Sequence, residues 1–268
     1  MIVTEVPTVR VRHEDRPGGV VAFVTIDNAR KLNVLNSPLM AAFIDAFDAL
    51  SGQDDLRAVV LTGAGERAFV GGADIDELAA LKGADDARAF IGKVHRCCAA
   101  VRDLPVPVIA RIDGYALGAG LELAASCDLR VASDRAVFGM PEVRLGIPSV
   151  VEAALLPGLI GWGRAREMLL LGETFDAAAA LSMGLVNAVA PPADLDAAVE
   201  ERVSCLLAAE PRAIRLQKAL IRQWEDLPMK DAIAAGADAL AAAYQTDEPA
   251  RAMAAFQAAR RARTPKAD

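Results

Sequence analysis

The segment from residue 107 to 128 constrains the fold most, because a strand pattern, a glycine-rich turn and a helix pattern follow one another directly. Residues 107–112 form an apolar, β-rich run. Gly114, Gly118 and Gly120 then fall within seven positions, and good helix formers follow them. Glycine allows a sharp backbone turn and lets another group approach closely. We therefore expect a strand, a tight turn and then a helix that begins near Gly118.

The start of that helix is a candidate site for negative charge. The first N–H groups of a helix have no partner within it, and the aligned peptide dipoles add a partial positive charge there. Such a terminus can hold a bound anion, or an oxygen that becomes anionic during a reaction. Glu122 stands in the first turn of this helix. Taken alone, the segment also fits a glycine turn that lets a helix pack closely.

Composition and charge narrow the class of protein. The chain has 268 residues, 54% of them hydrophobic, which suits one large domain or a core with a small appendage. The formal net charge is -7, and no basic stripe with interleaved aromatic residues is present, which argues against nucleic acid as a partner. The four cysteines match no zinc or CxxC spacing, and two histidines form no pattern for a metal site.

The expected location follows from two missing sequence patterns. The chain has neither a signal-peptide pattern nor a run of about 18 uncharged apolar residues. We therefore expect a cytoplasmic protein without a membrane span. Cys97 and Cys98 are adjacent in a helical pattern, so we expect them to act as small buried hydrophobic residues.

Strand and helix patterns alternate along the chain, as is typical of an α/β fold. We expect a hairpin over residues 9–27 and a helix that Ser37 caps, with Pro38 at its first position. A longer helix is expected over 85–102. Short strands are expected at 58–61, 129–132, 136–138 and 186–190.

Two consecutive prolines, Pro191 and Pro192, mark a boundary near the last of these strands. The residues after them read as alanine-rich helix with polar faces. We therefore predict a core over residues 1–191 and a C-terminal helical region over 192–268.

A second glycine segment spans residues 68–75. Gly71 and Gly72 let the backbone pass close to a ligand, so that the N–H of Ala73 points at a substrate oxygen. Asp74 can cap the helix that follows. From this segment alone, a capped turn with no further role is the better interpretation.

A third segment, residues 138–146, places Glu142 directly after a proline in a turn flanked by glycines. In an apolar setting its pKa would be raised, which suits proton transfer near neutral pH. From this segment alone, a surface glutamate paired with Arg144 is the better interpretation.

Residues 63–68 fit the pattern G-x-G-x-x-A after a predicted strand, which suggests a nucleotide-binding oxidoreductase as an alternative. A dinucleotide site needs a helix directly after this pattern. Residues 69–72 are Phe-Val-Gly-Gly, which breaks a helix. The alternative is therefore weak.

The three segments, in this order and at these spacings, resemble the crotonase family, also called the enoyl-CoA hydratase/isomerase superfamily. The resemblance covers most of the chain. Residues 32–36 resemble the CoA-contacting loop, 68–75 and 114–123 the two oxyanion segments, 138–146 the segment of the second glutamate, and 171–173 and 178–186 the later part.

The resemblance implies a crotonase-like spiral of repeated ββα units, with a C-terminal helical region through which the chains form homotrimers or homohexamers. It implies an acyl-CoA thioester substrate, with no metal and no cofactor beyond the coenzyme A of the substrate. By position, Ala73 and Ala119 supply the oxyanion-hole N–H groups, and Glu122 and Glu142 are the catalytic glutamates. The residues expected at the substrate are Ala29, Lys31, Leu32, Gly71, Gly72, Asp74, Ile75, Asp76, Gly118, Phe256 and Arg260.

Glutamates at both positions are, in this family, typical of a hydratase, which adds water across the 2,3 double bond of a trans-2-enoyl-CoA. The nearest alternative with the same fold is a Δ3,Δ2-enoyl-CoA isomerase. A non-catalytic homologue that binds acyl-CoA is a further alternative.

One segment departs from the hydratase pattern. After Pro148, hydratases usually carry a small, glycine-rich run, whereas this chain has Ser149, Val150, Val151 and Glu152. The bulk of Val150 and Val151 and the carboxylate of Glu152 should reshape the acyl pocket. The plainer alternative is that Glu152 starts a helix and pairs outward.

Overall fold

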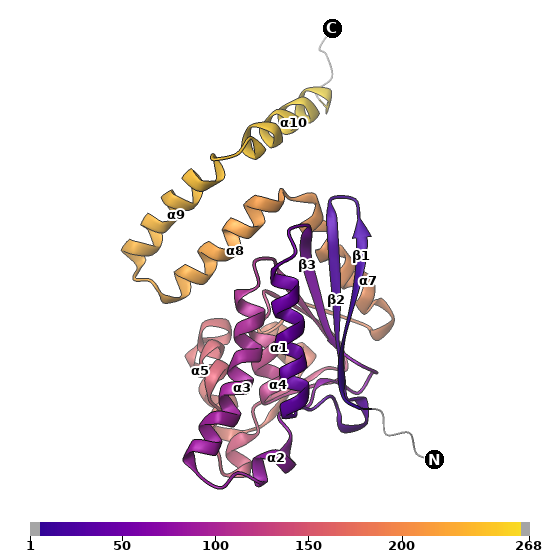
Figure 1. The fold of residues 1–268 in the computed structure, drawn as a ribbon, viewed down its shortest axis with the longest axis vertical. Coiled ribbons are helices and arrows are strands. Elements are labelled where there is room, and N and C mark those ends of the chain that lie inside the picture. The colour runs from indigo at the N-terminus through magenta and orange to yellow at the C-terminus, as the bar shows by residue number, and fades with distance from the viewer. Residues whose placement is uncertain (1–5, 264–268) are drawn as a thin grey trace. The chain divides into compact units, whose positions relative to one another are not determined.

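The computed structural model describes residues 6–263, and a six-stranded sheet forms the centre of its N-terminal part (Figure 1). The strand order is β1-β2-β3-β5-β7-β10. β1 and β2 form the antiparallel hairpin predicted from the sequence, and the other neighbours are parallel. The bounds are Thr8–Arg16 for β1, Gly19–Asp27 for β2, Leu56–Gly63 for β3, Val108–Ile112 for β5, Leu129–Ser133 for β7 and Ala188–Ala190 for β10.

A second sheet of four short strands has the order β4-β6-β8-β9. Each of its parallel strands directly follows a strand of the large sheet: β4 follows β3, β6 follows β5 and β8 follows β7. This repetition confirms the spiral of ββα units. The bounds are Ala68–Val70 for β4, Tyr115–Leu117 for β6, Val137–Gly139 for β8 and Thr174–Asp176 for β9.

Helices and single 3-10 turns connect the strands of the N-terminal part. α1 and α3 pack side by side, as Figure 1 shows. The helices are α1 (Ser37–Ser51), α2 (Ile75–Ala79), α3 (Ala84–Asp103), α4 (Ala119–Ala125), α5 (Leu156–Leu171), α6 (Ala177–Ser182) and α7 (Leu195–Ala208). The 3-10 turns are η1 (Ala29–Lys31), η2 (Glu142–Leu145), η3 (Val151–Leu155) and η4 (Pro192–Asp194).

The predicted cap of α1 was wrong by one residue. The side chain of Asn36 caps the helix by accepting a hydrogen bond from the N–H of Leu39 at 2.9 Å. Ser37 is already the first helical residue, and its own N–H and hydroxyl are bonded to Glu77. Asn and Ser are equally good caps, so the sequence could not separate the two neighbours.

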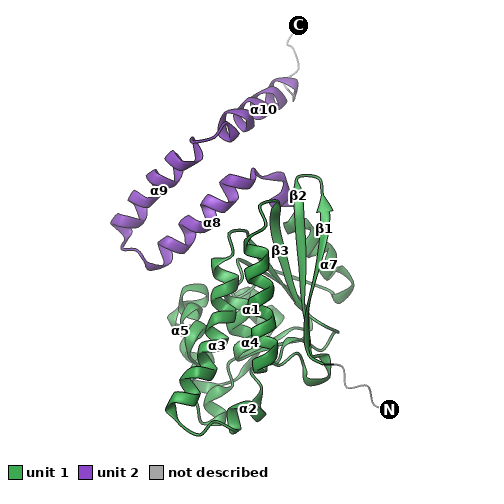
Figure 2. Ribbon diagram, viewed as in Figure 1, with its two compact units in different colours: residues 1–204 green, residues 205–268 purple. Residues whose placement is uncertain are grey.

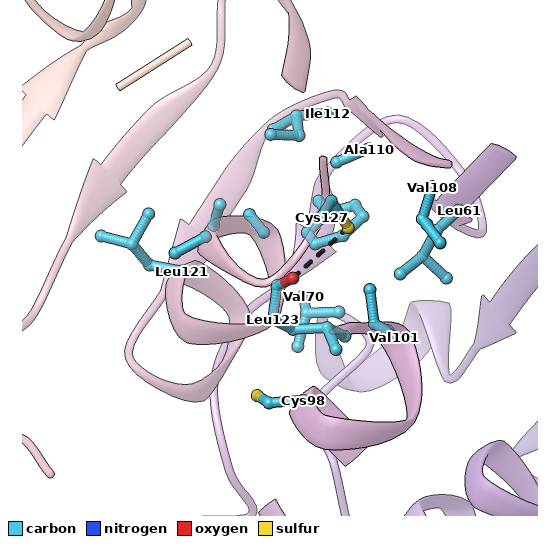
Figure 3. Close-up of a cluster of buried hydrophobic side chains, with 14 of the residues drawn as sticks. Leu61, Val70, Cys98, Val101, Val108, Ala110, Ile112, Leu121, Leu123 and Cys127 are labelled. Carbon is cyan, nitrogen blue, oxygen red and sulfur yellow. Dashed lines mark hydrogen bonds between the residues drawn. The ribbon is translucent and has the colours of Figure 1, made fainter. Parts of the chain in front are cut away.

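α4 lies in the middle of the core, and all seven of its residues are buried. A helix that is apolar all round is a core helix, and α4 departs from this only at Glu122. The sulfur of Cys127, just after α4, donates to the carbonyl of Leu123 at 3.4 Å (Figure 3). Figure 3 shows the apolar cluster to which α4 contributes Leu121 and Leu123; its other labelled members include Leu61, Val70, Cys98, Val101, Val108, Ala110 and Ile112.

The chain divides into two compact units, residues 1–204 and 205–268 (Figure 2). The second unit contains the predicted C-terminal helices: α8 (Pro211–Asp226), α9 (Met229–Ala243) and α10 (Glu248–Arg263). Within it, α8 and α9 pack together, and the indole N–H of Trp224 donates to the carbonyl of Ala232 at 2.8 Å. None of the helices that the structure describes is both long and apolar enough to cross a bilayer.

Candidate active site

A cavity of about 120 Å³ lies where the three sequence segments meet. Its walls come from residues within 71–78, 90–94 of α3, 118–122 and 141–150. Among the described residues that line it, Glu122 and Glu142 are the only charged ones, and the rest are glycine, proline or apolar. An apolar pocket with a few converging polar groups is the usual form of a small-molecule site.

Two backbone N–H groups of the cavity wall are available to a ligand. Ala119 is the first residue of α4, so its N–H has no acceptor within the helix. Ala73 lies between Gly72 and Asp74, which are both bonded to Leu35 at 2.9 Å. Within residues 6–263, neither the N–H of Ala73 nor that of Ala119 has a hydrogen-bond partner. Both residues line the cavity.

Gly118 and Gly120 allow neighbouring segments to lie close to the start of α4. Gly118 has φ +51°, and a Cβ there would clash with Oε1 of Glu142. A Cβ on Gly120 would clash with the carbonyl oxygen of Val70 in β4. Glycine at 118 thus lets a carboxyl group approach the start of α4, and glycine at 120 lets α4 pack on β4.

Glu122 is held inside the core, with 4% of its surface exposed. Burial, and after it the charge of Glu142, raises its pKa to about 8. The N–H of Ala153 donates to Oε1 at 3.3 Å and opposes the rise, while the charge of Glu152 adds to it. In the absence of substrate, Glu122 is therefore mostly protonated at neutral pH.

Glu142 lies in η2 and is half-buried. The hydroxyl of Ser149 donates to its Oε2 at 2.7 Å. Arg144 instead donates to the carbonyl of Leu171 at 3.1 Å and faces Glu173. The alternative of a surface pair between Glu142 and Arg144 is therefore not the arrangement in the structure. We expected burial to act on Glu142, whereas Glu122 is the more deeply buried of the two carboxyls.

The segment that departs from the hydratase pattern lies beside both glutamates. Val150 lines the cavity, and Val151, with φ +40°, packs partly buried against the core. Glu152 is 4% exposed, and its Oε1 lies 2.8 Å from Nδ1 of His95 in α3. The alternative that Glu152 pairs outward is wrong, because the helical turn that it enters is packed against α3 and α4.

The other predicted binding residues lie in three places: η1 and the residue after it, the start of α2, and α10. Ala29 and Lys31 form η1, and the carbonyl of Leu32 accepts from the N–H of Gly71 at 2.8 Å. Lys31 faces Asp76 at 3.0 Å. Asp74 caps α2 as expected, since its side chain accepts from the N–H groups of Asp76 and Glu77. Phe256 and Arg260 lie on α10, in the second unit, where Phe256 is exposed.

Sequence reasoning missed the two side-chain contacts of this region, Ser149 with Glu142 and His95 with Glu152. The unusual run after Pro148 indicated that this region differs from the usual hydratase pattern. It could not predict that Glu152 contacts His95, because His95 stands 57 positions before it in the sequence.

Repeated ββα units define a crotonase-type fold, and Ala73, Ala119, Glu122 and Glu142 line one cavity within it. Residues 16–264 match the family model described as enoyl-CoA hydratase/isomerase. The chain belongs to this family.

Curated relatives and solved structures agree with this assignment. A short-chain-enoyl-CoA hydratase of Clostridium acetobutylicum is 36% identical over 89% of this chain and 91% of its own length. A crotonyl-CoA hydratase of Syntrophomonas wolfei is 33% identical over 90% and 93%. The crystal structure of an enoyl-CoA hydratase from Mycobacterium smegmatis superposes with a TM-score of 0.89 at 30% identity, covering 94% of this chain and 96% of that one.

Proposed function

We propose that the protein is a hydro-lyase that adds water across the 2,3 double bond of a trans-2-enoyl-CoA thioester. The observation that carries the proposal is the convergence of four groups on one cavity: the N–H groups of Ala73 and Ala119 and the carboxyls of Glu122 and Glu142. The names of the curated relatives, short-chain-enoyl-CoA hydratase and crotonyl-CoA hydratase, support the same reaction class.

The two N–H groups act on the thioester. Its carbonyl oxygen accepts hydrogen bonds from Ala73 and Ala119, and these bonds strengthen as the oxygen becomes an enolate. A pair of preorganised donors of this kind contributes roughly 3–4 kcal/mol for each donor. The positive end of α4 points the same way.

The two glutamates handle the water. Glu122 in its ionised form takes a proton from a water held between the carboxyls, and the water oxygen bonds to Cβ as the double bond breaks. Glu142, protonated at the start of the step, gives its proton to Cα, which consumes the enolate. The proton that Glu122 took from the water then passes to Glu142, so that both carboxyls return to their starting state. A base works best when its pKa lies near the working pH, and the raised pKa of Glu122, about 8, meets this condition.

The substrate groups outside the cavity are assigned by family position. We propose that Ala29, Lys31 and Leu32, with the neighbouring Asp74 and Asp76, contact the coenzyme A part, and that Phe256 and Arg260 contact it from the C-terminal helices. The hydrogen bond from the N–H of Gly71 to the carbonyl of Leu32 supports the assignment of the loop at residues 29–32, because it joins that loop to the cavity wall. We propose a homotrimer or homohexamer, which sedimentation of the purified protein would measure.

The decisive experiment offers crotonyl-CoA and longer 2-enoyl-CoAs to the purified protein and follows the loss of enoyl absorbance. We expect hydration, and a fall in kcat of about 10³-fold in Glu122→Gln and in Glu142→Gln. Unchanged hydration in Glu142→Gln would refute the assigned acid.

Testing 3-enoyl-CoA beside the 2-enoyl-CoAs distinguishes the hydratase from the isomerase and from a non-catalytic homologue. A protein that isomerises 3-enoyl-CoA and never hydrates 2-enoyl-CoA is the isomerase, which needs a carboxyl only to move a proton between Cα and Cγ. A protein that binds acyl-CoA and turns over neither substrate is a non-catalytic homologue.

A further inference from the structure

A third buried carboxyl, that of Glu152, stands next to the two of the cavity. Its Oε1 lies 2.8 Å from Nδ1 of His95. Its Oε2 is buried and makes no hydrogen bond with any residue that the structure describes. A buried carboxylate is costly unless a positive charge or several donors compensate it, so the contact with His95 offsets part of the cost of burying Glu152.

The turn that carries Glu152 also touches Glu122. The N–H of Ala153, the next residue, donates to Oε1 of Glu122 at 3.3 Å and stabilises its ionised form. The charge of Glu152 acts in the opposite sense and favours protonated Glu122. One turn of 3-10 helix therefore presents a donor and a negative charge to the same carboxyl.

His95 is the compensating group that solvent can reach. It lies on α3, and its side chain is 55% exposed. Among the described residues, its Nδ1 is the polar atom within hydrogen-bond distance of the Glu152 carboxyl. Without this contact, the charge of Glu152 would act on Glu122 with little water to screen it.

Two further titratable groups interact with these carboxyls. Glu142 of η2 acts on Glu122, and both Glu122 and Glu152 act on Cys98 of α3. Burial raises the pKa of the Cys98 thiol well above its usual value, so Cys98 is neutral.

The other elements packed against η3 and α4 bring no competing charge. α5 packs on η3, but its Arg164 pairs with Glu167, and its Arg166 lies over the ring of Trp162 at 5.4 Å. β4 has no titratable residue, and Tyr115 of β6 is exposed.

We propose that His95 and Glu152 are positioning residues that act through Glu122: the contact with His95 offsets the charge of Glu152, and so allows Glu122 to ionise. The proposal rests on the proposed function for its effect on hydration, but the charge of Glu122 can be measured without it.

The two partners of the pair have opposite expected effects. Glu152→Gln removes a negative charge and leaves an amide of the same shape, so Glu122 ionises more easily. His95→Asn removes the imidazole that offsets the charge of Glu152, so Glu152 opposes the ionisation of Glu122 more strongly.

The activity test is the pH profile of kcat/KM for crotonyl-CoA. Wild type should show a rising limb near pH 8, as Glu122 ionises. We expect the midpoint to move down by about one pH unit in Glu152→Gln and up by about one pH unit in His95→Asn. The double variant lacks both the carboxylate of Glu152 and the imidazole of His95, and should move down like Glu152→Gln. His13→Asn, which changes the other histidine of the chain at an exposed position of β1, should leave the profile unchanged.

A second test reads Glu122 directly, by infrared titration of the carboxyl band that Glu122→Gln removes. The midpoint of that band should shift in the same two directions, whether or not the protein hydrates enoyl-CoA. A wild type that hydrates nothing would therefore refute the proposed function and leave this inference testable.

Shifts of one sign in both single variants, or a loss of kcat with no movement of either midpoint, would overturn the proposal. The second result would mean that the contact only anchors η3 to α3.

Discussion

The two carboxyls of the site are held in opposite ways. Glu122 lies on a helix whose seven residues are all buried, and its position follows from the packing of α4 on β4 and α3. Glu142 lies on a single exposed turn, and the hydroxyl of Ser149 orients it. Backbone packing therefore sets the position of Glu122, whereas local side-chain contacts set that of Glu142.

This contrast explains their electrostatics. A carboxyl inside a packed core loses its hydration, which raises its pKa, and Glu122 shows this effect. Glu142 keeps part of its surface in water and gains a hydroxyl donor. The site therefore combines Glu122, which is rigidly held and has a raised pKa, with Glu142, whose position depends on the neighbouring segment that carries Ser149.

The first prediction compares a glycine from each region, through the free energy of unfolding. Gly120→Ala places a methyl group against the backbone of Val70 and should destabilise the protein by about 3 kcal/mol or more. Gly146→Ala, at the end of η2, has open space but φ +80°, and should cost about 1 kcal/mol. Denaturant unfolding of both variants measures the difference. Equal losses would show that α4 is no more tightly packed than the exposed turn.

The second prediction concerns stability against pH. The pKa of Glu122 is about 8 when folded, against an ordinary 4.5. The folded protein therefore holds a proton that the unfolded chain releases between these values, and wild-type stability falls as pH rises through this window. Glu122→Gln avoids the loss and should be more stable by roughly 2 to 3 kcal/mol at pH 7.

Unfolding of wild type and Glu122→Gln at several pH values checks this prediction. The gap should vanish below about pH 4.5 and be widest above about pH 8. Glu142→Gln is the matched control, and a gap of the same size and pH dependence there would contradict the contrast between the two carboxyls.

The same contrast explains what the sequence could predict. Gly118 at the start of a helix and Asp74 as a cap depend on neighbours a few positions away, and both expectations are confirmed. The convergence of Ala73, Ala119 and the two glutamates came from the family resemblance, which carries long-range geometry that spacing alone does not contain.

Other features lay outside the reach of sequence patterns. β4, β6 and β9 have three residues each, too few for an alternating pattern, so the second sheet was not expected. The burial of Glu152 depends on α3, which is distant in sequence. Trimerisation through the C-terminal helices stays a prediction, as does the boundary after residue 191.

The smallest expected effect tests how Glu142 is held. Ser149→Ala removes the hydroxyl that donates to Oε2 and leaves the backbone of the turn unchanged. A hydrogen bond contributes about 1 kcal/mol net, so we expect kcat for crotonyl-CoA hydration to fall about fivefold, with little change in KM. Ser149→Thr keeps a hydroxyl and should restore most of the rate. Ser126→Ala is the control near Glu122, because the Ser126 hydroxyl bonds to the backbone carbonyl of Glu122 and not to its carboxyl. If Ser149→Ala retains full kcat, the exposed turn holds Glu142 without help, and the two carboxyls differ in burial but not in how they are positioned.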